Sequence, residues 1–239
     1  MTTASGPGRP VLELADVSKE YRGLRPLRIA SLTVVPGEHV AILGLDQTTA
    51  EVFVNLVTGA SLPDRGDVRL FGRSTAAIAD SADWLAVVDR FGIVSRRAVL
   101  LDSLTVVQNL AMPFTLEIEP PPDDIRQRAL VLARRVGLPE ETLDRPVAEL
   151  GPSGHVRVRL GRALALDPAV VILEHPTAEM PREDVPALAA QCRDVPAATI
   201  ALTADPAFAE AVADRCLTLN AATGILAGRS GWFSRLRRG

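Results

Sequence analysis

The feature that most constrains the fold is a series of short, uninterrupted apolar segments that alternate with longer amphipathic ones. Residues 40–43 and 170–173 are continuously apolar, which is the pattern of strands buried on both faces of a parallel sheet. The segment after Leu43 repeats apolar residues every three to four positions and therefore predicts a helix. Strands that alternate with helices predict βαβ units, a parallel sheet, and ligand sites at the carboxyl ends of the strands.

The same patterns predict the other elements. We expect further strands at residues 11–17, 32–35, 67–71, 91–95, 199–202 and 216–219. We expect further helices at residues 78–89, 104–114 and 123–136. Three consecutive prolines interrupt the chain before the last of these helices, which should end at Gly137. The middle third of the chain therefore predicts a helical subdomain at about residues 97–165, inserted in an α/β core.

Length and the character of the two ends indicate one domain with two tails. The chain has 239 residues, which suits a single large α/β domain at residues 11–228. Residues 1–10 predict a disordered N-terminal tail. Residues 229–239 form a basic C-terminal tail, for which a contact with anionic lipid or a partner and a disordered tail stay alternatives. No apolar run reaches the ~18–20 residues that span a bilayer, so we expect a cytoplasmic protein.

The charged residues exclude one class of partner and restrict the search for a phosphate site. A net charge of −3 argues against a general nucleic-acid binder. Lys19 is the only lysine among the 26 basic side chains, so the others are arginines. A site that needs a lysine beyond residue 19 is therefore excluded.

A strand-to-helix junction at residues 44–51 lies where a phosphate-binding loop belongs. Such a loop has the pattern G-x-x-x-x-G-K-[ST], in which glycines form a cradle, lysine contacts phosphates and the hydroxyl binds Mg²⁺. Here the sequence is Gly-Leu-Asp-Gln-Thr-Thr-Ala-Glu, and only Gly44 matches. Thr48 and Glu51 fit a capping box, which predicts that the helix N-terminus is satisfied by its own side chains. Glu51 and Asp46 would also repel an anion.

The surroundings of this junction carry a resemblance to a known family. The segment AILGLDQTTAEVFVNLVTGASLPDRGDVRLFG at residues 41–72 resembles, almost position by position, the ATP-binding subunit of ABC (ATP-binding cassette) transporters. The resemblance continues in the right order through the frames of the Q-loop, signature helix, Walker B and H-loop, at residues 91–114, 149–165, 170–177 and 199–219. It implies an α/β, P-loop NTPase-like fold with a mixed sheet core, an antiparallel β lobe and a helical subdomain.

The resemblance also implies ligands, partners and a location. ATP and Mg²⁺ would be the ligands, although binding should be weak or absent. A membrane permease subunit and a second cassette, identical or different, would be the partners, at the inner face of the cell membrane. Arg96 and Arg97 lie in the loop that contacts the membrane subunit in the family, or else form a solvated basic pair. The transported substrate is a property of the membrane subunit.

The family's nucleotide positions are replaced in this chain. By resemblance, the Walker A lysine and magnesium-binding hydroxyl fall at Ala50 and Glu51, the Q-loop glutamine at Arg96, the Walker B aspartate and catalytic glutamate at Glu174 and His175, the D-loop aspartate at Pro181, and the H-loop histidine at Ala204. The signature contains Pro152, which has no backbone N–H to donate. These changes predict a catalytically impaired, structural or regulatory cassette, with no catalytic residue of its own. The alternative is a functional, atypical ATPase whose site is completed by a partner subunit.

Three positions stay candidate site residues. Tyr21 falls at the family's adenine-stacking aromatic position, or is a strand-end tyrosine half-buried on the core. Gly44 either approaches phosphate or only meets the backbone geometry of the turn. Glu174 is a candidate metal ligand, with a structural carboxylate as the interpretation we favour. For His175, a packed strand-end histidine is favoured over a general base.

Overall fold

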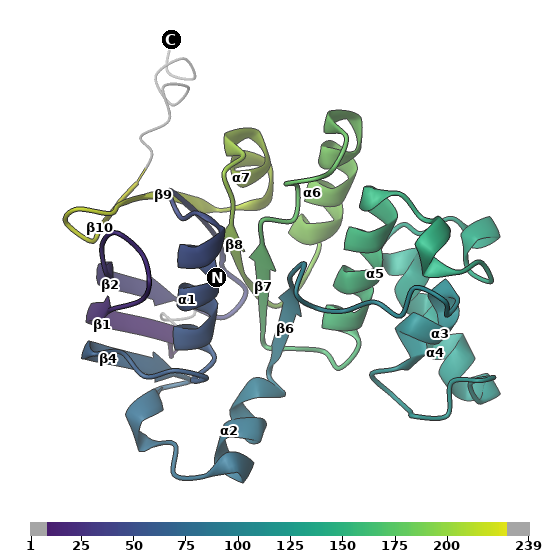
Figure 1. The fold of residues 1–239 in the computed structure, drawn as a ribbon, viewed down its shortest axis with the longest axis horizontal. Helices are drawn as coiled ribbons and strands as arrows, with labels where there is room; N and C mark the ends of the chain where they lie inside the picture. Colours follow the sequence, from purple (N-terminus) through teal and green to yellow (C-terminus); the bar gives the residue numbers. More distant parts are fainter. Residues whose placement is uncertain (1–8, 229–239) are drawn as a thin grey trace, which may run out of the picture.

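The computed structural model describes residues 9–228, which form two sheets with helices between and around them (Figure 1). The antiparallel sheet has the order β2-β1-β4-β5 and contains β1 (Leu12–Lys19), β2 (Leu27–Val34), β4 (Arg65–Leu70) and β5 (Arg73–Ser74). The larger sheet has the order β10-β9-β3-β8-β7-β6 and contains β3 (His39–Leu43), β6 (Phe91–Val94), β7 (Val170–Glu174), β8 (Ala198–Leu202), β9 (Arg215–Asn220) and β10 (Ile225–Gly228). Its strands pair in parallel, except for β10 with β9.

Successive side chains of the central strands enter two different hydrophobic cores. In β7, Val170 and Ile172 belong to the core shared with the antiparallel sheet, whereas Val171 and Leu173 belong to the core on the other face. Every residue of β3 and β7 is buried, because both faces of these strands are covered. This arrangement confirms the two strands that continuous apolar sequence predicted.

Helix α1 (Gln47–Val57) lies between the two sheets (Figure 1). Phe53, Leu56 and Val57 are fully buried, and the helix contacts β2, β4 and β7. Its position therefore joins the antiparallel sheet to the central one, and its first turn lies beside the end of β7.

The other helices cover the opposite face and one end of the molecule. The helices α6 (Val185–Arg193) and α7 (Pro206–Val212) pack on each other, and α7 contacts β3. The helices α3 (Val106–Ala111), α4 (Asp123–Arg135) and α5 (Pro152–Leu164) form a group far from the antiparallel sheet (Figure 1), and α5 also contacts β6. Helix α2 (Ser81–Val88) has no buried residue. Within residues 9–228, no helix combines the length and apolar character that crossing a bilayer requires.

These elements confirm the predicted fold class and most of the predicted segments. Two strands were missed, namely β5 and β10, which are only two and four residues long. Strand β2 begins at Leu27 rather than at residue 32, because the polar Arg28 and Ser31 interrupt the apolar run while pairing with β1 continues to Leu27. The helix predicted at residues 104–114 is confirmed in α3, but the extent of a helical subdomain at residues 97–165 stays a prediction. Residues 1–8 of the predicted N-terminal tail and the C-terminal tail at 229–239 lie outside the described residues.

Gly92 of β6 sets how closely α5 approaches the sheet. A Cβ atom at this position would lie 2.2 Å from the carbonyl oxygen of Ala163. We predict that Gly92→Ala lowers the free energy of unfolding by roughly 1–3 kcal/mol, because the strand and helix must separate. Urea denaturation measures the loss. The control Gly228→Ala, where no described atom lies within 4 Å of the new methyl group, should change it by less than about 0.5 kcal/mol. Equal losses would contradict the prediction.

Candidate functional site

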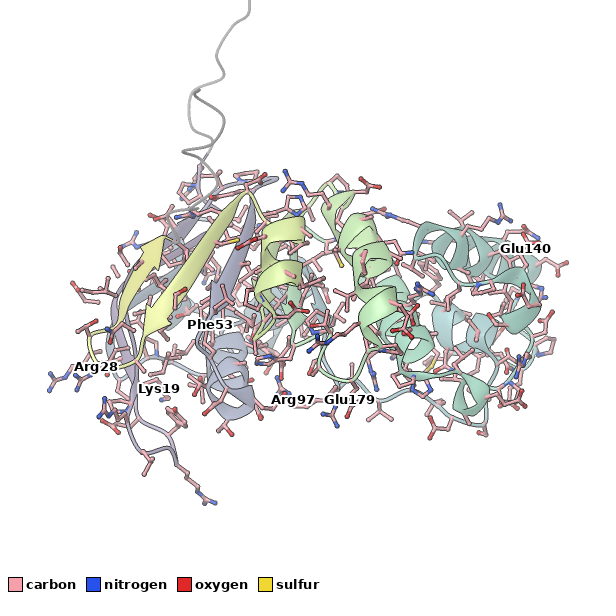
Figure 2. All side chains as sticks on the ribbon, turned by 90° about the horizontal axis from the view of Figure 1, so that it is seen from above. Lys19, Arg28, Phe53, Arg97, Glu140 and Glu179 are labelled. Atoms are coloured by element: carbon pink, nitrogen blue, oxygen red, sulfur yellow. The ribbon has the colours of Figure 1, made fainter. Side chains whose placement is uncertain are left out.

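The candidate site lies where β3 and β7 end at the same edge of the central sheet. Carboxyl ends of parallel strands are where open α/β sheets hold ligands. The junction after β3 leads into α1, while Glu174 and His175 follow each other at the end of β7. The segment after β6 adds Arg97, which Figure 2 labels near the middle of the molecule, away from Lys19. The fold thus brings residues from three separate segments together.

Gly44 has a backbone conformation that its neighbours require. Its φ is +93°, and a Cβ atom would lie 2.8 Å from the carbonyl oxygen of Leu219 in β9. A side chain would therefore be both strained and in contact with the neighbouring strand. This glycine is accounted for by the turn alone.

Asp46 caps the N-terminus of α1. Its backbone is extended, with φ −75° and ψ 176°, and its Oδ1 accepts a hydrogen bond of 2.7 Å from the backbone N–H of Thr49. The predicted capping box with Thr48 and Glu51 is therefore wrong, because the helix begins at Gln47, ahead of the predicted cap. The expected consequence holds through a different residue, since the helix end is satisfied by a side chain of the chain itself.

The cap places a stable negative charge at the helix N-terminus. Hydrogen bonds from the Thr49 side chain and then from its backbone N–H hold the pKa of Asp46 below its ordinary value. Asp46 is thus ionised at neutral pH, and the positive end of the α1 dipole is already compensated. An incoming phosphate would meet a carboxylate in place of free N–H groups.

No cation stands at the position where a phosphate-binding lysine would project. Ala50 is 0 % exposed and packs in the core that contains Phe53. The single lysine, Lys19, lies at the end of β1 and pairs with Asp64 at 2.9 Å. The basic group that a phosphate cradle needs is therefore replaced by a buried methyl group.

Glu174 is fully enclosed, and each of its carboxylate oxygens has a partner. Its side chain is 0 % exposed. Oε1 accepts a 2.6 Å hydrogen bond from Nε2 of Gln47, and Oε2 accepts one of 2.8 Å from the guanidinium of Arg97. The same guanidinium contacts Oε1 of Glu51 at 3.1 Å. Gln47, Glu51, Arg97 and Glu174, which we call the four-residue cluster, thus link α1, β7 and the segment after β6.

His175 follows Glu174 in an unusual backbone conformation. Its φ is +44°, and its N–H donates to the carbonyl of Leu202 at 2.8 Å. The side chain is buried, and its Nε2 has no hydrogen-bond partner within residues 9–228. A general base needs a group that orients its ring, and the described part of the chain provides none here.

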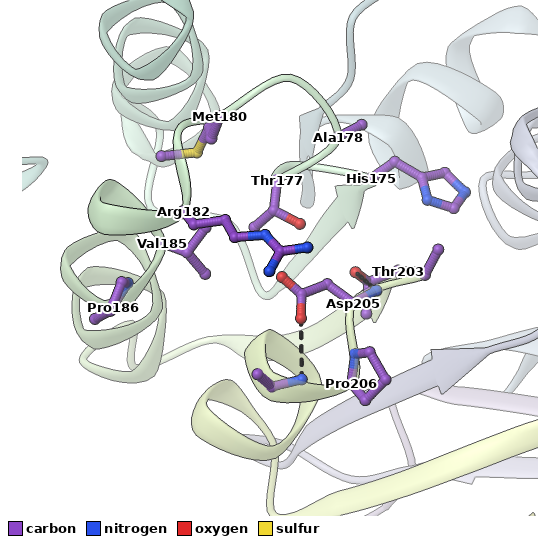
Figure 3. A pocket seen from close by; sticks show the side chains of 12 residues that line it. His175, Thr177, Ala178, Met180, Arg182, Val185, Pro186, Thr203, Asp205 and Pro206 are labelled. Atoms are coloured by element: carbon purple, nitrogen blue, oxygen red, sulfur yellow. Dashed lines mark hydrogen bonds between the residues drawn. The ribbon is translucent and has the colours of Figure 1, made fainter.

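A cavity of about 780 Å³ opens beside His175 (Figure 3). It lies at the carboxyl ends of β7 and β8, and Thr203 and Asp205 line one wall. Arg182 extends toward Asp205 across the cavity (Figure 3). Asp205 already caps α7 by accepting from the backbone N–H of Ala207 at 3.0 Å. The acid that lines this cavity is therefore engaged in holding a helix.

Tyr21 lies beside the first turn of α1. Its hydroxyl is 2.9 Å from Oγ1 of Thr49, and a second cavity of about 780 Å³ separates it from the turn after β3. Arg22 and Arg25 of the loop before β2, and Arg28 of β2 itself, also line this cavity. The fold therefore brings Tyr21 and Gly44 to one cavity and leaves Glu174 outside its lining.

The signature and Q-loop frames are also engaged within the chain. Ser153, at the start of α5, hydrogen-bonds to the carboxylate of Asp184 before α6. Arg96 pairs with Glu179 at 2.9 Å. Ser153 of the signature frame and Arg96, which the resemblance placed in the loop that contacts the membrane subunit, thus have partners inside this chain.

The residues of this site do not fit ATP with Mg²⁺. The helix end is capped by an acid, the lysine position is a buried methyl group, and the oxygens of Glu174 are used. Across residues 9–228, no three His, Cys, Asp or Glu side chains are placed to hold a metal ion. Three carboxylates, those of Asp46, Glu51 and Glu174, outnumber the single guanidinium of Arg97, so the end of β7 does not suit the added negative charge of a phosphate chain.

Sequence reasoning missed the four-residue cluster. Arg97 is 77 positions from Glu174 and Gln47 is 127 positions from it, so no local pattern relates them. The only signal was chemical, because a carboxylate ending a continuously apolar strand must find a partner once buried. That rule predicts a partner without identifying it.

Comparison with known proteins gives a consistent result. The protein-family model described as "ABC transporter" matches residues 27–178. The lipoprotein-releasing system ATP-binding protein LolD of Pseudomonas fluorescens is 32% identical over 176 residues, which are 72% of this chain and 77% of LolD. The methionine import ATP-binding protein MetN of Brucella abortus is 27% identical over 215 residues, which are 88% of this chain. The chain spans 58% of the length of that relative.

Solved structures of cassettes share the fold at low sequence identity. A dimeric bacterial ABC transporter cassette aligns with a TM-score of 0.74 at 20% identity, over 90% of this chain and 96% of that one. CbiO1 from Clostridium perfringens, part of an ABC transporter complex, aligns with a TM-score of 0.74 at 21% identity, over 92% and 87% of the two chains. The two-sheet architecture with its helical group is therefore that of these cassettes.

Removing the Asp46 carboxylate should destabilise α1 in a pH-dependent manner. We predict that Asp46→Ala lowers the free energy of unfolding by about 1 kcal/mol at pH 7. Because folding lowers the pKa of Asp46, its ionic stabilisation is present above the unfolded pKa and lost as pH falls through the folded pKa.

Urea denaturation of both proteins, from pH 7 down to about pH 3, should therefore show the difference shrinking with acidification. Asp46→Asn keeps a capping oxygen and serves as the control, with a smaller loss that varies less with pH. A difference that is constant or grows toward acid pH would contradict the role of the ionised cap.

Proposed function

The chain belongs to the ABC transporter family of ATP-binding cassettes, and we propose from this premise that it serves its transporter as a docking and regulatory subunit, a pseudo-ATPase, rather than as the subunit that hydrolyses ATP. The observation that carries the proposal is that the chain's own side chains occupy the contacts a nucleotide would need. Asp46 caps α1, and Arg97 and Gln47 take the oxygens of Glu174. The residues that retain the cassette fold are present, while those that bind phosphate are replaced.

The energetic consequence for ATP is large. Each charge-assisted hydrogen bond that is lost removes roughly 1.5–3 kcal/mol. Losing two of them weakens binding by roughly a hundredfold to ten-thousandfold, at about 1.4 kcal/mol per tenfold. Phosphoryl transfer depends on positioning and on neutralising phosphate charge, so turnover suffers more than binding.

The second candidate function is an atypical ATPase whose site is completed by a partner subunit. The cavity between Tyr21 and Gly44 favours it, since an adenine has space beside the tyrosine ring. It requires the partner to supply the phosphate-binding cation and the catalytic base. It also requires Glu174 to exchange Arg97 for Mg²⁺, which the first candidate does not.

One surface of the chain supports the proposed docking on a membrane partner. A cavity of about 390 Å³ lies between β6 and α5, and Met112, Arg159 and Arg162 line it. Burial lowers the pKa of both arginines, which donate to the backbone carbonyls of Ala98 and Val99 rather than to a carboxylate. Together with the exposed Val99, this surface suits an acidic, amphipathic segment of a membrane permease subunit.

The remaining features of the proposal follow the family. The helical group at about residues 97–165 acts as the lobe that presents this surface, and a second cassette pairs with the chain. The complex is located at the cytoplasmic face of the membrane. None of these features requires the chain to hydrolyse ATP.

The chemistry is tested by adding Mg-ATP to the purified chain. We expect calorimetric titration to millimolar Mg-ATP to show no saturable binding, and phosphate release to equal the buffer rate, because the phosphate cradle is absent. The double variant Ala50→Lys, Glu51→Ser should bind weakly at most and without turnover. Saturable binding by the natural chain, or turnover abolished by Glu174→Gln, would favour the atypical ATPase.

The docking surface is tested by isolating the tagged chain from its native host at its natural level. We expect a multispanning membrane protein to co-purify, and Val99→Asp to reduce its recovery at least tenfold, since a new carboxylate repels an acidic partner. Val99 is 71 % exposed. The matched control is Val131→Asp on α4, which is 60 % exposed and should leave recovery unchanged. Recovery of the chain alone, or equal losses in both variants, would contradict the proposal.

A further inference from the structure

A carboxylate that folding removes from water needs a compensating charge. Glu174 ends β7 with its side chain fully enclosed, between the first turn of α1 and the segment after β6. An unpaired buried carboxylate costs several kcal/mol, so such groups are paired or bind a metal. The identity of the cation that compensates Glu174 therefore decides how this region is held.

The compensating cation is part of the chain. Arg97 directs one terminal nitrogen at Glu174, at 2.8 Å, and the other at Glu51, at 3.1 Å. A guanidinium offers donors in a fixed planar fork and is weakly hydrated, so it is well suited to join two carboxylates. Mg²⁺ would need about six oxygen ligands near 2.1 Å, whereas the second oxygen of Glu174 already accepts from Gln47.

We infer that the guanidinium of Arg97 takes the place of a divalent cation in this cassette and holds the segment at residues 95–101 in one position without any ligand. This inference goes beyond the proposed function, because it concerns what organises the site in the absence of nucleotide. It identifies Arg97 as a positioning residue and Glu174 as its structural partner.

The segment at residues 95–101 is held at nearly every position, which gives the cluster a wider effect. Arg96 contacts Glu179, and Arg97 contacts Glu51 and Glu174. The carbonyls of Ala98 and Val99 accept hydrogen bonds from Arg159 and Arg162 of α5. Leu101 exchanges two hydrogen bonds with Asn109 of α3. Arg97 is the contact that fixes this segment to α1 and to β7. The segment joins β6 to α3, so its position relates the sheets to the helical group.

The pairing differs from an ordinary surface salt bridge in one respect. Arg97 is 41 % exposed, and exposed pairs contribute little. Its partner Glu174, however, is not exposed at all in the natural chain, so removing Arg97 takes the counter-ion from an enclosed carboxylate. By contrast, both members of the neighbouring Arg96–Glu179 pair are 55 % exposed. Arg96 is therefore a matched control for Arg97.

The first experiment compares melting temperatures in EDTA and in millimolar Mn²⁺, without nucleotide. The natural chain should melt at the same temperature in both. Arg97→Ala should lower the melting temperature in EDTA by about 4–8 °C, and Mn²⁺ should restore at least half of that loss through the freed carboxylates. Arg96→Ala should change it by less than about 2 °C and show no response to Mn²⁺.

Neutralising both partners separates charge from packing. The double variant Arg97→Gln, Glu174→Gln should recover most of the lost melting temperature and show no response to Mn²⁺, since no buried charge remains. If Arg97→Ala fails to fold, this double variant and Arg97→Lys, which keeps the charge but loses the fork, carry the test. A double variant as unstable as Arg97→Ala would overturn the inference. If Arg97→Ala does not fold, a double variant no more stable than a poorly folded Arg97→Lys would overturn it.

Hydrogen exchange tests the positional part of the inference. In Arg97→Ala, peptides covering residues 95–101 should exchange at least tenfold faster, while those of α4 stay unchanged. Unchanged exchange at residues 95–101 would overturn the proposed positioning role. If Mn²⁺ stabilised the natural chain but not Glu174→Gln, the metal would be displacing the guanidinium. That result would also overturn the inference. Because no nucleotide is added, these outcomes are independent of the ATP measurement.

Discussion

The buried carboxylate of Glu174 is the constraint on which the rest of the site depends. Its enclosure at the end of β7 requires donors, and Gln47 and Arg97 supply them. Gln47 can do so because α1 begins at that residue, and α1 begins there because Asp46 caps it. The acid at the helix N-terminus is thus connected to the burial of a single glutamate.

The same principle extends around the site. Tyr21 lies within hydrogen-bond distance of Thr49, Ser153 bonds to Asp184, and Arg96 pairs with Glu179. In each case a side chain that faces the family's ligand frame is satisfied from within the chain. The two-sheet architecture does not depend on those contacts, because its stability comes from the two cores on either side of the central strands. Fold and ligand chemistry are therefore separable in this protein.

Features set by residues close in sequence could be predicted, and features set by residues distant in sequence could not. The strands β3 and β7 were predictable because burial on both faces leaves a continuous apolar pattern, and α4 because its period and Gly137 define it. The cap of α1 was misplaced, because Asp46 and Thr48 both satisfy the local rule and only tertiary contacts choose between them. The four-residue cluster was out of reach, since its members approach through chain folding rather than through spacing.

The packing of Ala50 has a consequence for substitutions in the site. Its methyl group is enclosed in the same core as Phe53, so a longer side chain at this position must displace neighbours at a cost of roughly 1–3 kcal/mol. Replacing Asp46 removes the cap of α1, and replacing Arg97 leaves a buried charge without its counter-ion. Each single substitution toward a phosphate-binding loop thus lowers the stability of the fold before a second substitution can add a ligand contact. The internal contacts of this cassette thus act together against any single substitution toward a phosphate-binding loop.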